Sequence, residues 1–160
     1  MFKIEKEIHS NIRSTASKNM LSIMKIILNE KPSKEDISEI REGLRNYNRP
    51  FLENIRDEDV ALYVNDDNGK KIAGIVGRLW GNWLMVEFLW VSEPEKGKSL
   101  GSKLLSKLES YAVTQGCHAS MLNTASFQAE PFYRKHGYKT KMLLENFSED
   151  AELYYMTKPL

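Results

Sequence analysis

The chain has 160 residues, a length that suits a single domain with one hydrophobic core. Apolar residues make up 41% of it and charged residues 28%, and the formal net charge is +1. This balance gives no electrostatic footprint for nucleic acid or a membrane surface, so we expect neither as a partner. No apolar run reaches the roughly 18 residues of a membrane span. The single cysteine favours the reducing cytoplasm, and we expect a cytoplasmic protein.

The first part of the chain divides into an extension and the start of a domain. Residues 1–19 alternate charges with single isoleucines and lack the h-region of a secretory signal. They predict an N-terminal extension, either flexible or a short helix, ahead of a domain over residues 20–160. Leu21–Leu28 is short, apolar and rich in isoleucine, which predicts a strand.

A helix is predicted next. Ser33 and Asp36 have the spacing of a capping box, in which a side chain at each end satisfies a backbone N–H of the first turn. The apolar positions that follow have helical spacing, and they are Ile37, Ile40, Leu44 and Tyr47. Proline lacks the N–H that a helix interior needs, so Pro50 is expected to end this helix.

Three strands follow, joined by tight turns. Asp67-Asn68-Gly69-Lys70 lies between two apolar runs, and Asn-Gly is a strong hairpin signal because both residues tolerate positive φ. Trp80-Gly81-Asn82 is a second turn, and residues 83–91, "WLMVEFLWV", are the third strand. The pattern predicts an antiparallel meander.

The second half of the chain begins with a change of period. A helical stripe closed by Gly116 is formed by Leu100, Leu104, Leu105, Leu108, Tyr111 and Ala112. A strand over 117–125, a short helix over 128–137 and a closing hairpin from Tyr138 onward complete the chain. The expected fold is an α/β (α+β) domain with a mixed, mostly antiparallel sheet of six to seven strands flanked by helices.

The loop before the striped helix contains Gly97-Lys98-Ser99, which looks like the end of a nucleotide-triphosphate loop. That motif needs a glycine where Ser92 stands, and Glu95 inside the loop would repel phosphate, so the ATP interpretation is poor. Two interpretations stay open on this segment alone. It is a solvated turn with Ser99 as a simple helix cap, or a helix N-terminus that binds an anion with help from nearby lysines.

Two motifs at matching spacing carry a family resemblance. Lys96-Gly97-Lys98-Ser99-Leu100-Gly101 stands, after a strand and before a helix, for the pattern Arg/Gln-x-x-Gly-x-Gly/Ala. Ala129, Tyr133, Gly137 and Tyr138 stand for a short helix with Ala-x-x-x-Tyr and a closing Gly-aromatic pair. With "FLWV" before the loop and "SFQA" before the tyrosine, the chain from Leu21 onward resembles the GNAT superfamily of acyl-CoA-dependent N-acetyltransferases.

The resemblance implies acetyl-CoA, or coenzyme A, as cofactor. It implies that the backbone of Leu89, Trp90 and Val91 pairs with the pantetheine arm, and that the loop wraps the diphosphate. The loop residues are Lys96, Gly97, Lys98, Ser99, Leu100, Gly101 and Ser102. Ser126, Phe132 and Lys135 are further candidates for this site, although Ser126 could equally be a helix cap and Lys135 could simply complement the C-terminus of its helix. The sequence departs from the family at Lys96, where arginine or glutamine is usual, and at Ser99, which replaces a glycine and would be strained if that position needs positive φ.

Amide formation from an amine and a thioester needs a base for the amine and a proton for the thiolate. Glu87 is the candidate base, expected on the same strand face as Leu89 and Val91 and desolvated by apolar neighbours. It could equally be a rim glutamate paired with Arg78. The resemblance gives Tyr133 the role of acid, and its alternative is a buried tyrosine that packs beside Phe132.

Candidates for the acceptor site are Tyr47, Arg78, Trp80 and Asn123, which could equally be packing residues. We expect a small-molecule or peptide amine as substrate, direct attack on the thioester, no metal, and a possible homodimer by family analogy. The alternative function is a module that binds acyl-CoA without catalysis, for regulation or interaction. The identity of the amine and the oligomeric state lie beyond what the sequence indicates.

Overall fold

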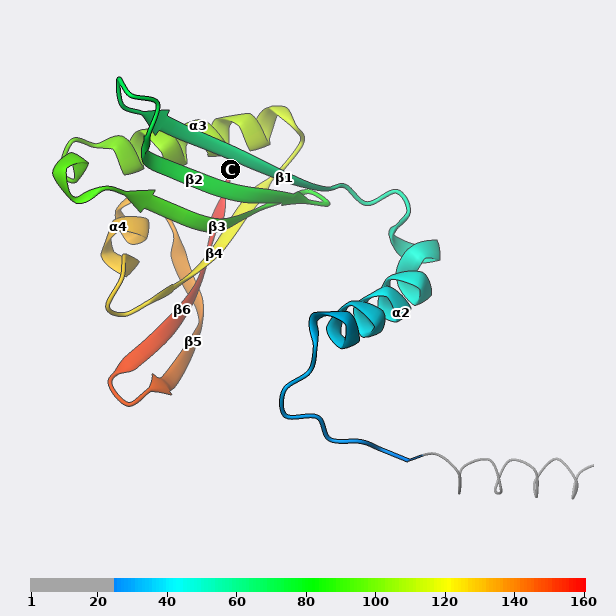
Figure 1. Ribbon diagram of the computed structural model, residues 1–160. Coiled ribbons are helices and arrows are strands. Elements are labelled where there is room, and N and C mark those ends of the chain that lie inside the picture. The colour runs from blue at the N-terminus through cyan, green and yellow to red at the C-terminus, as the bar shows by residue number, and fades with distance from the viewer. Residues whose placement is uncertain (1–24) are drawn as a thin grey trace, which may run out of the picture. The chain divides into compact units, whose positions relative to one another are not determined.

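The computed structural model describes residues 25–160 (Figure 1). It divides into two compact units, one that ends at Pro50 and one over Phe51–Leu160. The predicted extension over residues 1–19 lies outside the described residues, as does the first half of the predicted strand Leu21–Leu28. The second half of that prediction is wrong, because residues 25–28 form no strand and their side chains are exposed. A strand is stable only beside a partner, and apolar composition alone supplies none.

Helix α2, Lys34–Leu52, begins with the predicted capping box. The Ser33 N–H donates to Asp36 Oδ2 at 2.8 Å, and the Asp36 N–H donates to Ser33 Oγ at 3.0 Å. Hydrogen bonding to the carboxylate, first by the Ser33 backbone N–H and then by the Ser33 hydroxyl, holds the pKa of the Asp36 carboxyl below its usual value. The predicted end is wrong, since the helix continues through Pro50 to Leu52. A proline near the last turn removes only one hydrogen bond and need not stop the helix.

The second unit begins with the predicted meander of β1, Asp57–Asn65, β2, Lys71–Trp80, and β3, Trp83–Val91. Both connections have a glycine with positive φ, +81° at Gly69 and +56° at Gly81. Asp66 closes the first turn, because its Oδ1 accepts from the N–H groups of Asn68 at 3.0 Å and Lys70 at 2.9 Å. The predicted antiparallel pairing of all three strands is confirmed.

The remaining helices and strands lie where the sequence predicts them, and a 3₁₀ turn that it did not predict precedes the second helix. They are a 3₁₀ turn η1, Glu93–Glu95, helix α3, Leu100–Thr114, strand β4, Ala119–Ala125, helix α4, Glu130–Lys135, and the hairpin β5, Lys139–Ser148, with β6, Ala151–Pro159. The six strands form one sheet in the order β1-β2-β3-β4-β6-β5. The expected fold class is confirmed, with six strands among the described residues.

At the centre of the sheet β3 pairs with β4 in parallel, whereas every other strand pair among the described residues is antiparallel. It covers Trp83–Val86 against Ala119–Leu122. Beyond this contact β3 runs on to Val91 and β4 to Ala125 without pairing to each other, so the two strands diverge. The divergence leaves one backbone edge of the end of β3 without a neighbouring strand among the described residues.

The hydrophobic core lies between the sheet and α3, which crosses the β1–β3 part of it (Figure 1). Leu105 and Leu108 on α3 are fully buried and pack with Ile75, Leu79 and other sheet residues. The striped face predicted for the helix is confirmed at Leu104, Leu105, Leu108 and Ala112, whereas Tyr111, predicted on the same stripe, is exposed. Cys117 is buried in the same core, as expected of a small apolar residue.

Two polar pairs lie within this core. The hydroxyls of Ser120 and Tyr138 are hydrogen-bonded at 2.7 Å, and both residues are fully buried. Lys158 Nζ donates to Glu109 Oε2 at 2.7 Å, while Glu109 Oε1 is buried with no hydrogen-bond partner among residues 25–160. Burial therefore raises the pKa of the Tyr138 hydroxyl, and the nearby Glu109 carboxylate adds to the effect.

A β-bulge in β3 sets which side chains face the core. Val76 pairs with Phe88 but Gly77 pairs with Val86, so Glu87 is an extra residue on β3. Before the bulge the even-numbered residues of β3 face the core, and after it Leu89 does. No helix among residues 25–160 combines the length and apolar character needed to span a bilayer.

Candidate functional site

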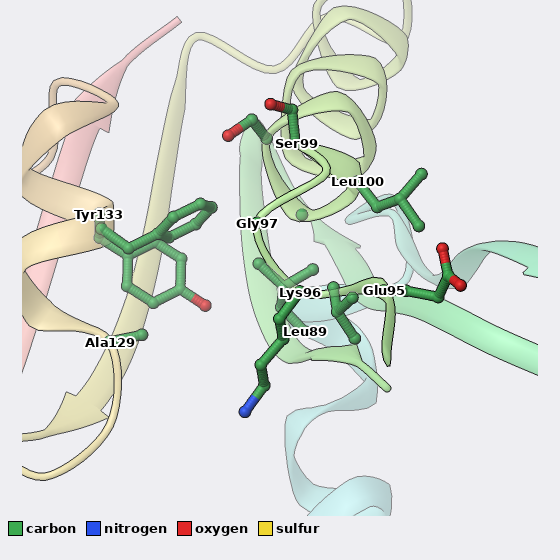
Figure 2. Close-up of a pocket in the computed structure, with 12 residues that line it drawn as sticks. Leu89, Glu95, Lys96, Gly97, Ser99, Leu100, Ala129 and Tyr133 are labelled. Carbon is green, nitrogen blue, oxygen red and sulfur yellow. The ribbon is translucent and has the colours of Figure 1, made fainter. Parts of the chain in front are cut away.

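A cavity of about 510 Å³ lies where the end of β3, the start of α3 and helix α4 meet. It is lined by Leu89, Val91, Glu95, Lys96, Gly97, Ser99, Leu100, Gly101, Ser102, Ala129, Phe132 and Tyr133. We call this cavity the donor pocket, because its lining includes residues that the sequence predicted for the acetyl donor. Figure 2 shows Tyr133 and Ala129 on one side of it, with Leu89, Lys96 and Gly97 on the other. The structure thus brings together most of the residues that the two sequence motifs predicted for a cofactor.

The loop at the start of α3 has an unusual backbone. Gly97 has φ +77° and Ser99 has φ +61° with ψ +15°, in the left-handed region that favours glycine. Ser99 therefore has the positive φ that strains a residue with a side chain, which is the condition that the sequence raised for this position. Its side chain makes no capping hydrogen bond, so it does not act as the simple helix cap that the sequence left open. The first backbone N–H groups of α3 consequently remain available to an acceptor in the pocket.

Carboxylates next to the loop engage its lysines. Lys96 pairs with Glu93, and Lys98 Nζ lies 3.0 Å from both carboxylate oxygens of Glu95. Lys96 lines the donor pocket, whereas Lys98 is not among the lining residues. Both lysines and Glu93 are largely exposed, and Glu95 is partly exposed, so each pair is worth at most about 1 kcal/mol and its lysine can exchange to another anion.

The end of β3 forms one wall of the donor pocket. Leu89 and Val91 pair with Ile75 and Ala73 of β2 on one strand edge, and their side chains line the pocket. Trp90 points to the opposite face of the sheet and is half exposed, so only its backbone can serve the predicted role. The other backbone edge of β3 at these residues has no pairing with β4, because that pairing ends at Val86.

Tyr133 lies on α4, where it is buried and lines one side of the donor pocket. It contacts Phe132 edge-on, with ring centroids 5.2 Å apart, and its hydroxyl has no hydrogen-bond partner among the described residues. Burial raises the pKa of the Tyr133 hydroxyl, which therefore stays protonated at neutral pH. A phenol in this state can donate a hydrogen bond into the pocket. Phe132 also lies against Gly101, where an added Cβ would sit 3.6 Å from its ring.

Two predicted cofactor residues lie elsewhere. Ser126 ties the β4–α4 loop to β6, since its N–H donates to the Glu152 carbonyl at 2.9 Å and its Oγ accepts from the Glu152 N–H at 3.2 Å. It is neither in the donor pocket nor the cap of α4, whose N-cap is Ala129. Lys135 is exposed at the last turn of α4 and is likewise absent from the lining.

A second cavity, of about 550 Å³, lies on the opposite face of the sheet, and we call it the acceptor pocket. It is lined by Arg78, Trp80, Met85, Val86, Glu87, Phe88, Met121, Leu122 and Asn123. Three of the four predicted acceptor-site residues meet here together with Glu87. The fourth, Tyr47, is exposed on α2 in the first compact unit.

Glu87 does not lie where strand alternation predicted. The bulge turns its side chain toward Arg78 and Phe88, away from the face that carries Leu89 and Val91. It is exposed rather than enclosed by apolar side chains, so the expected desolvation is absent. Glu87 follows the last residue of β3 that pairs with β4, Val86, and it lines the acceptor pocket only.

Sequence reasoning missed several lining residues. Glu95 and Ala129 line the donor pocket, and Ala129 could have been found because it belongs to the tyrosine motif. Met85, Phe88 and Met121 line the acceptor pocket, and only the bulge, which leaves no mark in the sequence, decides that Phe88 faces it. Across residues 25–160, no three His, Cys, Asp or Glu side chains are grouped to hold a metal ion.

Comparisons with known proteins agree with this arrangement. The profile described as acetyltransferase (GNAT) family matches residues 21–138. A blasticidin-S acetyltransferase from Streptomyces morookaense is 31% identical over 112 residues, which are 69% of this chain and 82% of that protein. An acetyltransferase from Bacillus cereus, solved at 1.9 Å, is 32% identical with a TM-score of 0.76, covering 86% of this chain and 99% of that one.

A more distant structure shares the fold. It is from Bacillus anthracis, is described as a streptothricin acetyltransferase, and was solved in complex with acetyl coenzyme A. It shares the fold with a TM-score of 0.56 at 18% identity, covering 64% of this chain and 62% of that one. The chain belongs to the acetyltransferase (GNAT) family and is an acetyltransferase.

Proposed function

We propose that the protein transfers the acetyl group of acetyl-CoA to a primary amine of a small molecule or peptide by direct attack of the amine on the thioester. The donor pocket is the observation that carries this proposal. It places an uncapped helix N-terminus, a free strand edge and a buried phenol around one cavity. A relative named for blasticidin S supports a small-molecule acceptor.

The loop and α3 suit the diphosphate of coenzyme A. The N–H groups that open α3 have no internal partners, and the helix dipole makes this end partly positive. Positive φ at Gly97 and Ser99 curves the loop around the pocket, and Lys96 adds a cation at its rim. The end of β3, at Leu89 and Val91, offers backbone groups on the edge that β4 leaves open, which is suited to the amide-bearing pantetheine arm.

The chemistry requires one bond to form and one to break. The amine nitrogen bonds to the acetyl carbon, the carbon–sulfur bond breaks, and the sulfur takes a proton. Tyr133 supplies that proton, because its buried hydroxyl is protonated and lies in the donor pocket. Glu87 accepts the proton of the amine from the acceptor side, directly or through water. The divergence of β3 and β4 lets the two reactants meet from opposite faces of the sheet.

Two experiments test this function in sequence. Coenzyme A should raise the melting temperature of the full chain, and acetyl-CoA with a broad amine panel should release free thiol together with acetylated amine. Stabilisation by coenzyme A without turnover on any amine would favour the alternative, a cofactor-binding module without catalysis. Stabilisation by ATP with Mg²⁺ but not by coenzyme A would refute the proposed donor.

Tyr133→Phe separates catalysis from binding. The change removes one hydroxyl from a buried ring, so coenzyme A affinity should be nearly unchanged while kcat falls about a hundredfold, the usual size of a general-acid contribution. Tyr111→Phe is the matched control, since Tyr111 is partly exposed on α3 and does not line the donor pocket. Equal activity of the two variants would remove Tyr133 from the mechanism.

A further inference from the structure

One residue that lines the acceptor pocket, Arg78, forms an ion pair with Asp57. The Arg78 guanidinium donates through Nε to Asp57 Oδ1 and through Nη2 to Asp57 Oδ2, a two-pronged pairing that engages both carboxylate oxygens. Arg78 lines the pocket from β2, and Asp57 stands at the start of β1. Such planar pairing fixes the guanidinium more firmly than a single contact does.

The surroundings of Arg78 are otherwise negative. Asp59 lies opposite Arg78 in the β1–β2 register, and Asp59 and Glu87 both act electrostatically on the guanidinium together with Asp57. Three carboxylates thus surround one cation and leave two formal negative charges, 3 − 1 = 2. Among the lining residues of the acceptor pocket, Arg78 is the one cationic side chain.

Aromatic side chains complete the pocket. Trp80 and Phe88 line it and remain about half or more exposed, so their ring faces are open to a ligand. A positively charged group is attracted to such a face, whereas a carboxylate is not. Charge and aromatic content therefore favour the same kind of acceptor.

We propose that Asp57 is a specificity-determining residue that, by holding Arg78, makes the acceptor pocket select amines with a second positive charge and reject amines with a carboxylate. This inference rests on the proposed acetyl transfer and names the acceptor class of its amine site. A free arginine in the pocket would bind the carboxylate of an amino acid in the same two-pronged way. Asp57 occupies that position as an internal competitor, at the high effective concentration of a group attached to the same fold.

The experiment uses three acceptors of similar size. They are propylamine, 1,3-diaminopropane and β-alanine, which carry beside the reacting amine no charge, an ammonium and a carboxylate. With wild-type protein and acetyl-CoA, kcat/KM should be highest for the diamine and lowest for β-alanine. Asp57→Asn should move the ratio of kcat/KM for β-alanine to kcat/KM for the diamine about fivefold to tenfold toward β-alanine, the size expected for the loss of one half-exposed charge whose interactions are screened by water.

Two further variants make the test specific. Asp57→Asn combined with Arg78→Gln should lose the new preference for β-alanine, because the arginine that Asp57 released is gone. Glu58→Gln is the matched control, as it removes the same charge from the neighbouring residue, whose side chain alternates to the other face of β1. The control should leave the acceptor ratio unchanged. Melting temperatures establish that each variant is folded.

The outcomes separate the two proposals. Turnover of amines by wild type with an unchanged acceptor ratio in Asp57→Asn overturns the specificity role alone. An equal shift in Glu58→Gln also overturns it, because the effect would then be one of overall charge. If wild-type protein acetylates none of the three amines and no member of a wider panel, the proposed function fails, and the acceptor selectivity fails with it.

Discussion

Gly77 on β2 lies closely against both the neighbouring strand β3 and helix α3. A Cβ added at this residue would lie 2.9 Å from Leu84 Cδ1, 3.0 Å from Leu108 Cδ2 and 3.1 Å from the Met85 carbonyl oxygen. Leu84 and Leu108 are fully buried, and the carbonyl belongs to a paired strand, so neither side can retreat freely. We therefore predict that Gly77→Ala destabilises the protein.

The expected size follows from two opposing effects. Overpacking a filled core costs about 1 to 3 kcal/mol. Replacing glycine at an ordinary φ recovers about 0.4 to 1 kcal/mol, because the unfolded chain loses freedom, and Gly77 does not have a positive φ. Overpacking is the larger effect, and the free energy of unfolding should fall by about 1 to 2 kcal/mol. Gly74→Ala on the same strand is the matched control, since its Cβ would meet nothing closer than 3.4 Å.

Urea unfolding, followed by tryptophan fluorescence, measures both variants. Gly77→Ala should lower the transition midpoint with an unchanged slope, while Gly74→Ala should leave the midpoint unchanged or raise it. If Gly77→Ala were as stable as wild type, or no less stable than Gly74→Ala, the reasoning that α3 is seated directly on this glycine would be refuted. The same result would call into question the position of the loop that α3 carries.

Three other predictions concern polar groups. Lys158→Met should cost about 2 to 4 kcal/mol because it leaves the buried Glu109 carboxylate unpaired, and adding Glu109→Leu should restore most of the loss in chemical unfolding. Burial raises the pKa of the Tyr138 hydroxyl, so the protonated hydroxyl stabilises the fold fully below the pKa of tyrosine in the unfolded chain, about 10, and this stabilisation is lost at higher pH. The melting temperature should therefore fall above about pH 10, and Tyr138→Phe should reduce that fall. Ser33→Ala should return the pKa of Asp36 toward its usual value in an NMR titration, and an unchanged titration would contradict the capping box.

The sequence predicted elements where local rules decide the outcome. The turns at Gly69 and Gly81, the capping box at Ser33 and the striped helix that starts at Leu100 all depend on residues close together in the chain. The motif around Tyr133 likewise predicted a wall of the donor pocket. In each case the local geometry requires particular residue types, and these can be recognised directly in the amino-acid sequence.

Other features depend on contacts between segments that are distant in the chain, and the amino-acid sequence does not show these contacts. The bulge at Glu87 arises from how β2 and β3 pair, and it reverses the face predicted for that carboxylate. Ser126 was placed at the cofactor by its position in a motif, but β6, which lies later in the chain, bonds to its backbone and hydroxyl. Strand pairing between distant segments decides both outcomes, and a single sequence gives no measure of it.

The short parallel contact between β3 and β4 also affects the mechanics of the sheet. Four residue pairs join the β1–β3 meander to the three strands β4, β6 and β5, so this seam is narrow compared with the ladders on either side of it. Such a seam can act as a hinge, along which the two halves of the sheet twist relative to each other. A molecule wedged between the diverging strands would brace both halves, and amide hydrogen exchange at residues 83–86 should slow when it is in place.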